Sequence, residues 1–91
     1  MMASVEKING KIEVYKAVTH PGSLKILAVL SRSPAGFTEI MFESKLSPSV
    51  LNKLLKDLVT HSIISKKGKE YIITSKGEQI LRILLELTNV L

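Results

Sequence analysis

The chain has 91 residues and a formal net charge of +5, and all of this charge arises between Lys45 and Lys69. Six lysines stand there against the single acid Asp57, whereas the rest of the chain balances its acidic and basic side chains. A concentrated basic surface is typical of a protein that contacts phosphates with one face, although a solvated lysine-rich surface is the alternative. The absence of cysteine excludes disulfides, thiolate metal sites and thiol nucleophiles.

The first ten residues contain Glu6 and Lys7 and lack an apolar run, so we expect no secretory signal. Apolar stretches elsewhere are too short to cross a bilayer. We therefore expect a cytoplasmic protein without a membrane partner. Residues 1–91 are expected to form one small domain. The lysine- and isoleucine-rich composition, with only two arginines, favours an archaeal or thermophilic source.

The first predicted helix covers residues 11–19, where apolar residues recur at helical spacing and Asn9 is the expected N-cap. The Asn9-Gly10 pair is also a hairpin signal between Val5–Ile8 and Lys11–Val14, and this hairpin is the alternative.

Two further helices are expected after the break at Pro21. The first runs from residue 24 to about residue 31 and is mostly buried. A loop at residues 33–36 follows, because serine, proline and glycine cluster there. The next helix covers residues 37–44, with Thr38 or a neighbour as its cap.

The clearest segment of the chain runs from Ser47 to His61. Ser47 is a good N-cap, and Pro48 suits the first helical position because its missing N–H would have no partner there. Apolar residues at helical spacing form one face, and polar, mainly basic residues form the other. The pattern predicts an amphipathic helix with a basic outer face.

Two short strands are predicted next, at Ile63-Ile64 and Tyr71–Ile73. The segment between them, Ser65–Glu70, contains a glycine and three lysines, which predicts a hairpin with a basic tip. Thr74 or Ser75 is expected to cap a final helix.

This final helix, expected to end near Val90, is too apolar to have only one buried face. The side that does not pack on the domain would form an exposed apolar patch, which usually marks a partner surface. A homodimer is the simplest partner because two-fold association uses the same patch twice, and a helix fully covered by the core is the alternative. The residues assigned to the dimer interface are Leu81, Leu84, Leu85, Leu87 and Leu91.

The order of these elements is that of a winged helix-turn-helix, and three segments carry a closer resemblance. His20–Leu27 resembles the "HP…L.IL" helix start of ArsR-type regulators. Leu46–Leu58 is similar to the recognition helix of the ArsR and MarR families, and Tyr71–Gly77 resembles the "Y.LT..G" segment after the wing of MarR-like regulators. The resemblance implies an α+β winged helix-turn-helix fold, mainly α with a small β-hairpin, in which residues 75–91 form a dimerisation helix.

The resemblance also implies a homodimeric transcription regulator that binds double-stranded DNA sequence-specifically. The helix Ser47–His61 would enter the major groove, which at about 12 Å accepts an α-helix. Asn52 would then read adenine and Lys53 guanine, while the hairpin lysines meet the backbone. Exposed polar residues without a role are the alternative for Ser49 and Asn52. The residues assigned to DNA binding are Ser47, Ser49, Asn52, Lys53, Lys56, Lys66, Lys67 and Lys69.

The sequence departs from the family pattern at several positions. Met41 and Lys45 stand where a small residue and a turn glycine are usual, so the turn is expected to open or lengthen. Ser23 replaces a common arginine. The cysteine-rich metal box of ArsR sensors is absent, so no metal or other cofactor is expected. His20 is instead expected to cap a helix, and His61 to lie at a helix C-terminus.

Enzymatic activity is not expected. The sequence has no phosphate-binding glycine loop, and the spacing of Glu39 and Glu43 indicates a solvated helix edge. A protein-docking module and a non-specific nucleic-acid binder are the alternatives to a sequence-specific regulator. No small-molecule effector can be predicted, because the sequence shows no polar cluster that indicates one; any effector would have to bind in a cleft between the helices of the dimer.

Overall fold

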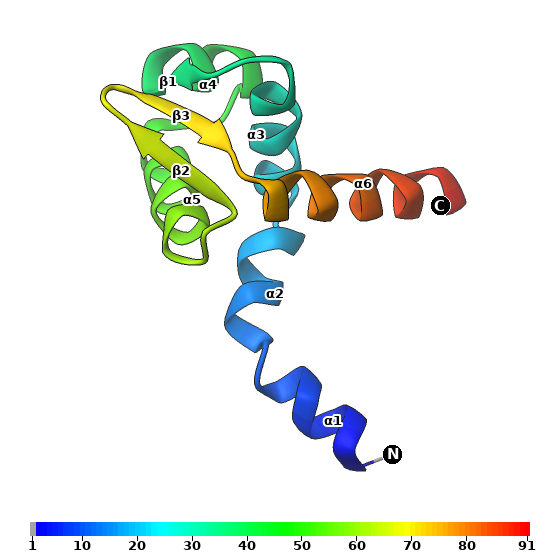
Figure 1. Cartoon of the computed structure of the whole chain (residues 1–91). Coiled ribbons are helices and arrows are strands. Elements are labelled where there is room, and N and C mark those ends of the chain that lie inside the picture. Colours follow the sequence, from blue (N-terminus) through cyan, green and yellow to red (C-terminus); the bar gives the residue numbers. More distant parts are fainter. Residues whose placement is uncertain (1) are drawn as a thin grey trace.

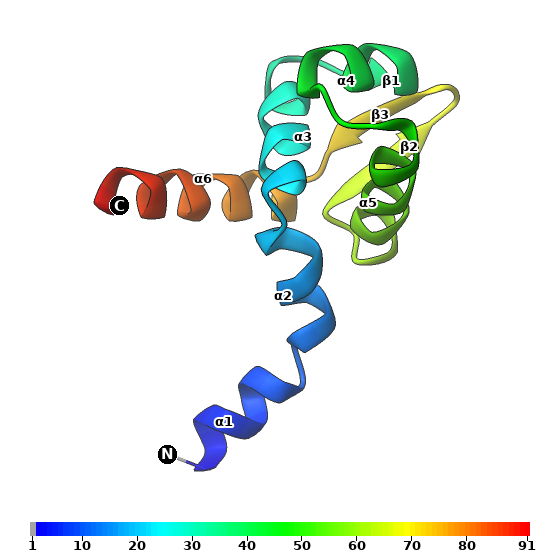
Figure 2. The same ribbon diagram turned by 180° about the vertical axis from the view of Figure 1, so that it is seen from behind.

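A computed structural model describes residues 2–91, with side chains from Ser4 onward (Figure 1). The elements in chain order are α1 (Met2–Asn9), α2 (Ile12–Thr19), α3 (Pro21–Arg32), β1 (Ala35–Gly36), α4 (Phe37–Ser44), α5 (Pro48–Thr60), β2 (Ile64–Lys67), β3 (Glu70–Ile73) and α6 (Ser75–Val90). Helices α3, α4 and α5 surround the small sheet, while α1–α2 and α6 extend from this body in two directions (Figures 1 and 2). The predicted fold class, mainly α with a small β-hairpin, is confirmed.

The N-terminal segment is helical on both sides of Gly10, so the predicted helix at residues 11–19 is confirmed and the alternative hairpin does not form. Helix α1, which the sequence did not predict, continues to Asn9, and the Gly10 N–H donates to the Glu6 carbonyl at 3.0 Å. The prediction that Asn9 caps α2 is wrong, because its backbone is already helical and an N-cap must be non-helical. Lys11 stands at the N-cap of α2, without a side-chain hydrogen bond.

Helix α3 begins with a side-chain cap from His20, as expected. The Nδ1 atom of His20 accepts a hydrogen bond from the Gly22 N–H at 2.9 Å. The helix starts at Pro21, earlier than predicted, because a proline at the first helical position leaves no donor unpaired. The buried Ser23 hydroxyl donates to the Ala17 carbonyl and joins α3 to α2.

Helix α4 has the predicted bounds, but its N-cap is Gly36, and no side chain caps it. Thr38 lies inside the first turn, so its assignment as the cap is corrected. The turn to α5 does not open or lengthen, because Lys45 itself adopts the left-handed conformation, with φ 59° and ψ 26°. Its N–H donates to the Met41 carbonyl at 2.9 Å, which closes α4 as a glycine would.

The sheet is antiparallel, with the strand order β1-β3-β2. The predicted hairpin is confirmed, and the short strand β1 is an addition that pairs Ala35 with Tyr71. The β2–β3 turn is tighter than predicted, because Gly68 accepts a positive φ of 62° and leaves only residues 68–69 outside the strands. Lys66 and Lys67 therefore lie on β2, and the prediction that they belong to the turn is wrong.

The core lies between α3, α4, α5, the sheet and the first half of α6. Its fully buried apolar side chains come from α3, α4, α5 and the start of β2. They are Ile26, Leu27, Ile40, Leu51, Leu55, Leu58, Ile63 and Ile64. Helix α6 adds Leu81 to this cluster. The four buried leucines of α5 lie on one face of the helix. They determine which side of α5 faces the core and which side faces solvent.

The first turn of α6 lies against the backbone that follows α5. Thr74 caps α6 by accepting from the Gly77 N–H at 3.1 Å, and its hydroxyl donates to the carbonyls of Ser62 and Ile63 at 2.7 and 2.8 Å. A Cβ atom on Gly77 would come within 2.2 Å of the Ile63 carbonyl oxygen. Glycine at this position therefore sets how closely α6 approaches the end of α5.

We expect Gly77→Ala to lower the free energy of unfolding by about 1–3 kcal/mol, because the added methyl group meets fixed backbone. The matched control is Gly10→Ala, where the nearest atoms to a Cβ lie at 3.6 Å. Urea unfolding followed by circular dichroism measures both variants. Equal stabilities of the two would contradict the proposed close contact at Gly77.

Candidate nucleic-acid interface

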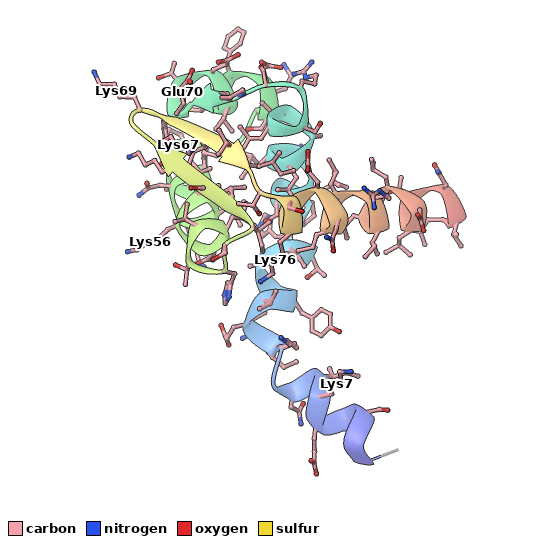
Figure 3. All side chains as sticks on the ribbon, viewed as in Figure 1. Lys7, Lys56, Lys67, Lys69, Glu70 and Lys76 are labelled. Atoms are coloured by element: carbon pink, nitrogen blue, oxygen red, sulfur yellow. The ribbon has the colours of Figure 1, made fainter. Side chains whose placement is uncertain are left out.

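The outer face of α5 carries the polar residues that the sequence predicts for DNA contact. Because the leucines of α5 bury the opposite side, Asn52, Lys53 and Lys56 are exposed, and so are Ser47 and Ser49 at the N-terminal end. Figure 3 shows Lys56 on α5 and Lys69 on the hairpin projecting from the same side of the molecule. The structure thus brings Asn52, Lys56 and Lys66 to one surface, whereas Lys67 lies on the opposite face of the hairpin.

The N-terminus of α5 is capped by Ser47, whose hydroxyl oxygen accepts from the Val50 N–H at 3.4 Å. The Ser47 hydroxyl accepts this hydrogen bond, and its own O–H can still donate to a group outside the protein. The positive end of the helix dipole lies at the same place. Ser47 and Ser49, both exposed, therefore lie where a phosphate oxygen would be stabilised.

Lys53 forms an ion pair with Asp57 one turn later, with Nζ and Oδ2 2.9 Å apart. The lysine side chain is 76% exposed, and the aspartate side chain is 38% exposed. Exposed pairs of this spacing are worth only about 0.3–0.5 kcal/mol. Lys53 is therefore held in place weakly and can exchange its partner at little cost.

The three hairpin lysines do not form one cluster. Successive strand residues point to opposite faces, so Lys66 and Lys67 on β2 project in opposite directions. The Lys66 Nζ lies over the ring of Tyr71, 5.5 Å from its centroid, and these two residues are cross-strand partners. Lys69, at the turn itself, projects into solvent (Figure 3).

A crevice of about 400 Å³ separates α5 from the hairpin. Asn52, Lys56 and Thr60 line it from the helix, and Lys66 and Tyr71 line it from the strands. Thr60 and Tyr71 were not predicted to belong to this surface. The cross-strand position of Tyr71 opposite Lys66 is the signal that could have found it, once the register of the hairpin is known.

His20 and His61 lie on different elements, but both line one crevice of about 290 Å³ between α2 and α5. Glu13 and Asp57 line the same crevice. Within residues 2–91 no three side chains of the metal-binding types are grouped closely enough to hold an ion. His61 stands at the C-cap of α5, the position that the sequence predicts.

The residues assigned to a dimer interface have unequal positions on α6. Leu81 is 7% exposed and already belongs to the core of its own chain, so its assignment to that surface is corrected. Leu84 is half-buried against the core, whereas Leu85, Leu87 and Leu91 are exposed. Ile83 and Val90 on the same helix are also exposed. Every helix within residues 2–91 is too short or too polar to span a bilayer.

A family model described as winged helix-turn-helix matches residues 23–91. The chain therefore belongs to the winged helix-turn-helix family of DNA-binding domains, which confirms the resemblance seen in the sequence. The matched region begins inside α3 and includes α4, α5, the sheet and α6. No curated protein matches the chain.

Solved structures extend the comparison. A predicted DNA-binding transcriptional regulator from E. coli is 28% identical, with a TM-score of 0.65, over 99% of this chain and 95% of that one. The homodimeric winged helix-turn-helix DNA-binding domain of a possible ArsR-family regulator from Mycobacterium bovis is 19% identical, with a TM-score of 0.67, over 96% and 82%. A methyltransferase of calicheamicin biosynthesis is 16% identical, with a TM-score of 0.64, but only 23% of its length is covered. The likeness to the last two shows the fold alone.

We expect Asp57→Asn to change the free energy of unfolding by less than about 0.5 kcal/mol, because its pair with Lys53 is exposed. Chemical unfolding of the two proteins measures the difference. A loss of more than about 1 kcal/mol would mean that Lys53 is fixed by the fold and is not free to meet another partner.

Proposed function

We propose that this protein is a homodimeric transcription regulator that binds double-stranded DNA sequence-specifically, with residues 1–91 acting as one unit in the cytoplasm. The observation that carries the proposal is the outer face of α5, where an amide and two lysines stand exposed beside a basic hairpin. A major groove of about 12 Å accepts such a helix. The E. coli structure, described as a DNA-binding regulator, supports the same function.

Base reading is assigned to Asn52 and Lys53. An asparagine amide can donate to N7 and accept from N6 of adenine through its two ends, and a lysine can donate to O6 or N7 of guanine. Lys53 would leave Asp57 to do so. The exposed position of that ion pair makes the exchange inexpensive.

Phosphate contacts are assigned to the remaining predicted residues. Ser47 and Ser49 would hold a phosphate at the N-terminus of α5, and Lys56 would meet the backbone beside the groove. Lys66, Lys67 and Lys69 would extend these contacts along the hairpin. About five neutralised phosphates per protomer give a slope of log affinity against log salt of roughly −4 to −5 per half-site.

Dimerisation is assigned to the exposed apolar part of α6, within residues 75–91. Leu85, Leu87 and Leu91 are 48%, 51% and 93% exposed, and Leu84 is half-buried against the core. Large apolar patches are rare on monomeric proteins, which favours self-association. The description of the Mycobacterium bovis domain as homodimeric supports this assignment.

The first experiment is selection of bound duplexes from a random-sequence pool at about 150 mM salt. A two-fold symmetric motif would establish sequence-specific binding by a dimer. Binding without enrichment would replace the proposal with non-specific binding through the lysines. No binding would favour a winged helix that docks on protein, and neither this role nor the proposed one makes the chain an enzyme.

Two substitutions separate base reading from phosphate contact. We expect Asn52→Ala to lower affinity for the selected site by about 1–3 kcal/mol and to relax preference at one base pair. Lys67→Ala should weaken binding to all sequences alike and reduce the salt slope by about 1. Fluorescence anisotropy with matched and mismatched duplexes measures both effects. Equal losses on every sequence for Asn52→Ala would remove it from base reading.

The dimer surface is tested with Leu87→Glu, because the Leu87 side chain is 51% exposed and its replacement leaves the core intact. We expect a monomer by light scattering, because a carboxylate in the apolar surface would be buried without a partner. Gln79→Glu, which adds the same charge at another exposed position of α6, is the control and should stay dimeric. A dimeric Leu87→Glu protein would show that this surface is not the interface.

A further inference from the structure

Tyr71 is the one aromatic residue in the described strands, and both neighbouring strands fix its backbone. It pairs with Ala35 of β1 on one side and with Lys66 of β2 on the other. The half-buried side chain packs on the hydrophobic core and also lines the crevice of about 400 Å³ between α5 and the hairpin. The ring therefore lies at the boundary between the core and the surface proposed to bind DNA.

The ammonium group of Lys66 lies over this ring, with Nζ 5.5 Å from the ring centroid. A cation within about 6 Å of an aromatic centroid is attracted by the negative face of the ring. The pair two residues nearer to the core on the same face, Ile64 and Ile73, is aliphatic. The aromatic residue thus stands at the cross-strand position where this face of the hairpin changes from apolar to charged.

Lys66 differs from the lysines around it in its partner. Lys53 pairs with Asp57, and Lys67 stands directly across the strands from Glu70. No carboxylate among the described side chains forms an ion pair with Lys66. Its positive charge is therefore held by the ring without being neutralised.

The pair of Lys66 and Tyr71 faces α5. Asn52 and Lys56 line the same crevice from the helix, whereas Lys67 projects from the opposite face of the hairpin. A DNA strand that passes along the outer face of α5 would meet this side of the hairpin first. A phosphate there would find Lys66 already oriented, so the lysine would lose little of its rotational freedom on binding.

We propose that Tyr71 is a positioning residue for DNA binding, whose ring holds the ammonium group of Lys66 on the α5 side of the hairpin, where Lys66 contacts a backbone phosphate. The inference rests on the proposed function above. The effect extends to every DNA sequence, because phosphate contacts carry no sequence information. An aliphatic residue at position 71 would still pack on the core but would leave the lysine unattached.

The experiment measures the affinity of the full chain for a random-sequence duplex of about 20 base pairs, at about 150 mM salt, by fluorescence anisotropy. Tyr71→Leu should weaken binding about two- to fivefold, the factor that an exposed cation–π contact is worth. Lys66→Gln should weaken it by about tenfold, because it removes the charge itself. Tyr71→Phe keeps the ring and should bind as tightly as the unchanged protein.

Double-mutant cycles separate this role from simple packing. Tyr71→Leu should weaken binding no further once Lys66→Gln is present, because the ring then has no ammonium group to hold. The matched control uses Lys67, which is next in the chain but lies on the opposite face, so the losses of Tyr71→Leu and Lys67→Gln should multiply. A merely structural Tyr71 would give the same loss in both backgrounds.

Two further measurements serve if Tyr71→Leu fails to fold. Pentafluorophenylalanine at position 71 keeps the shape of the ring but inverts its charge distribution, so it should weaken binding as Tyr71→Leu does, whereas Tyr71→Phe does not. In the absence of DNA, the ring current should move the ε-CH₂ proton resonances of Lys66 upfield of those of Lys67 in NMR spectra of the unchanged protein.

Four outcomes would overturn the inference. They are unchanged affinity of Tyr71→Leu, losses of Tyr71→Leu and Lys66→Gln that multiply, equal losses in Tyr71→Phe and Tyr71→Leu, and Lys66 resonances without the upfield shift. If the unchanged protein binds no duplex, the proposed function fails and the role of Tyr71 fails with it. The upfield shift of Lys66 would persist in that case, so the two failures are distinguishable.

Discussion

The end of α5 is held by the first turn of α6, and the positions of α5 and the hairpin both depend on this contact. The carbonyls of residues 61–63 accept hydrogen bonds from Thr74 and Lys76. These carbonyls follow the last turn of α5, where backbone acceptors have no helical partner. Because β3 ends just before Thr74, one small junction fixes α5, the hairpin and α6 relative to one another, and Gly77 leaves the room that it needs.

Much of this fold could be predicted because its strongest local signals agree with its packing. Ser47 and Pro48 begin α5 as expected, since capping and the missing proline N–H act within a few residues. The two-residue strand β1 could not be predicted from the sequence, because it forms only through pairing with β3. Helix α1 was not predicted for another reason, because an Asn-Gly pair such as Asn9-Gly10 is common both at helix ends and in hairpin turns.

The residues of the candidate site could be predicted from the sequence, but how they lie relative to one another could be predicted only in part. The amphipathic pattern of α5 identified its exposed residues, because one buried face determines the other. The pattern of α6 could not show that Leu81 meets the core of its own chain, since apolar residues surround most of that helix. The hydrogen bond between Lys76 and the His61 carbonyl could not be predicted from the sequence, because these residues meet only once the hairpin has brought α6 to the end of α5.

The turn between α4 and α5 also limits how much change the chain can absorb. Lys45 holds a left-handed conformation that costs a residue other than glycine about 1–2 kcal/mol. Small domains have only about 5–15 kcal/mol of total stability. The turn also places a positive charge next to the N-terminus of α5. Ser62, with φ 60°, adds a second such residue just after α5, so the two turns that bound this helix together take about 2–4 kcal/mol from that total.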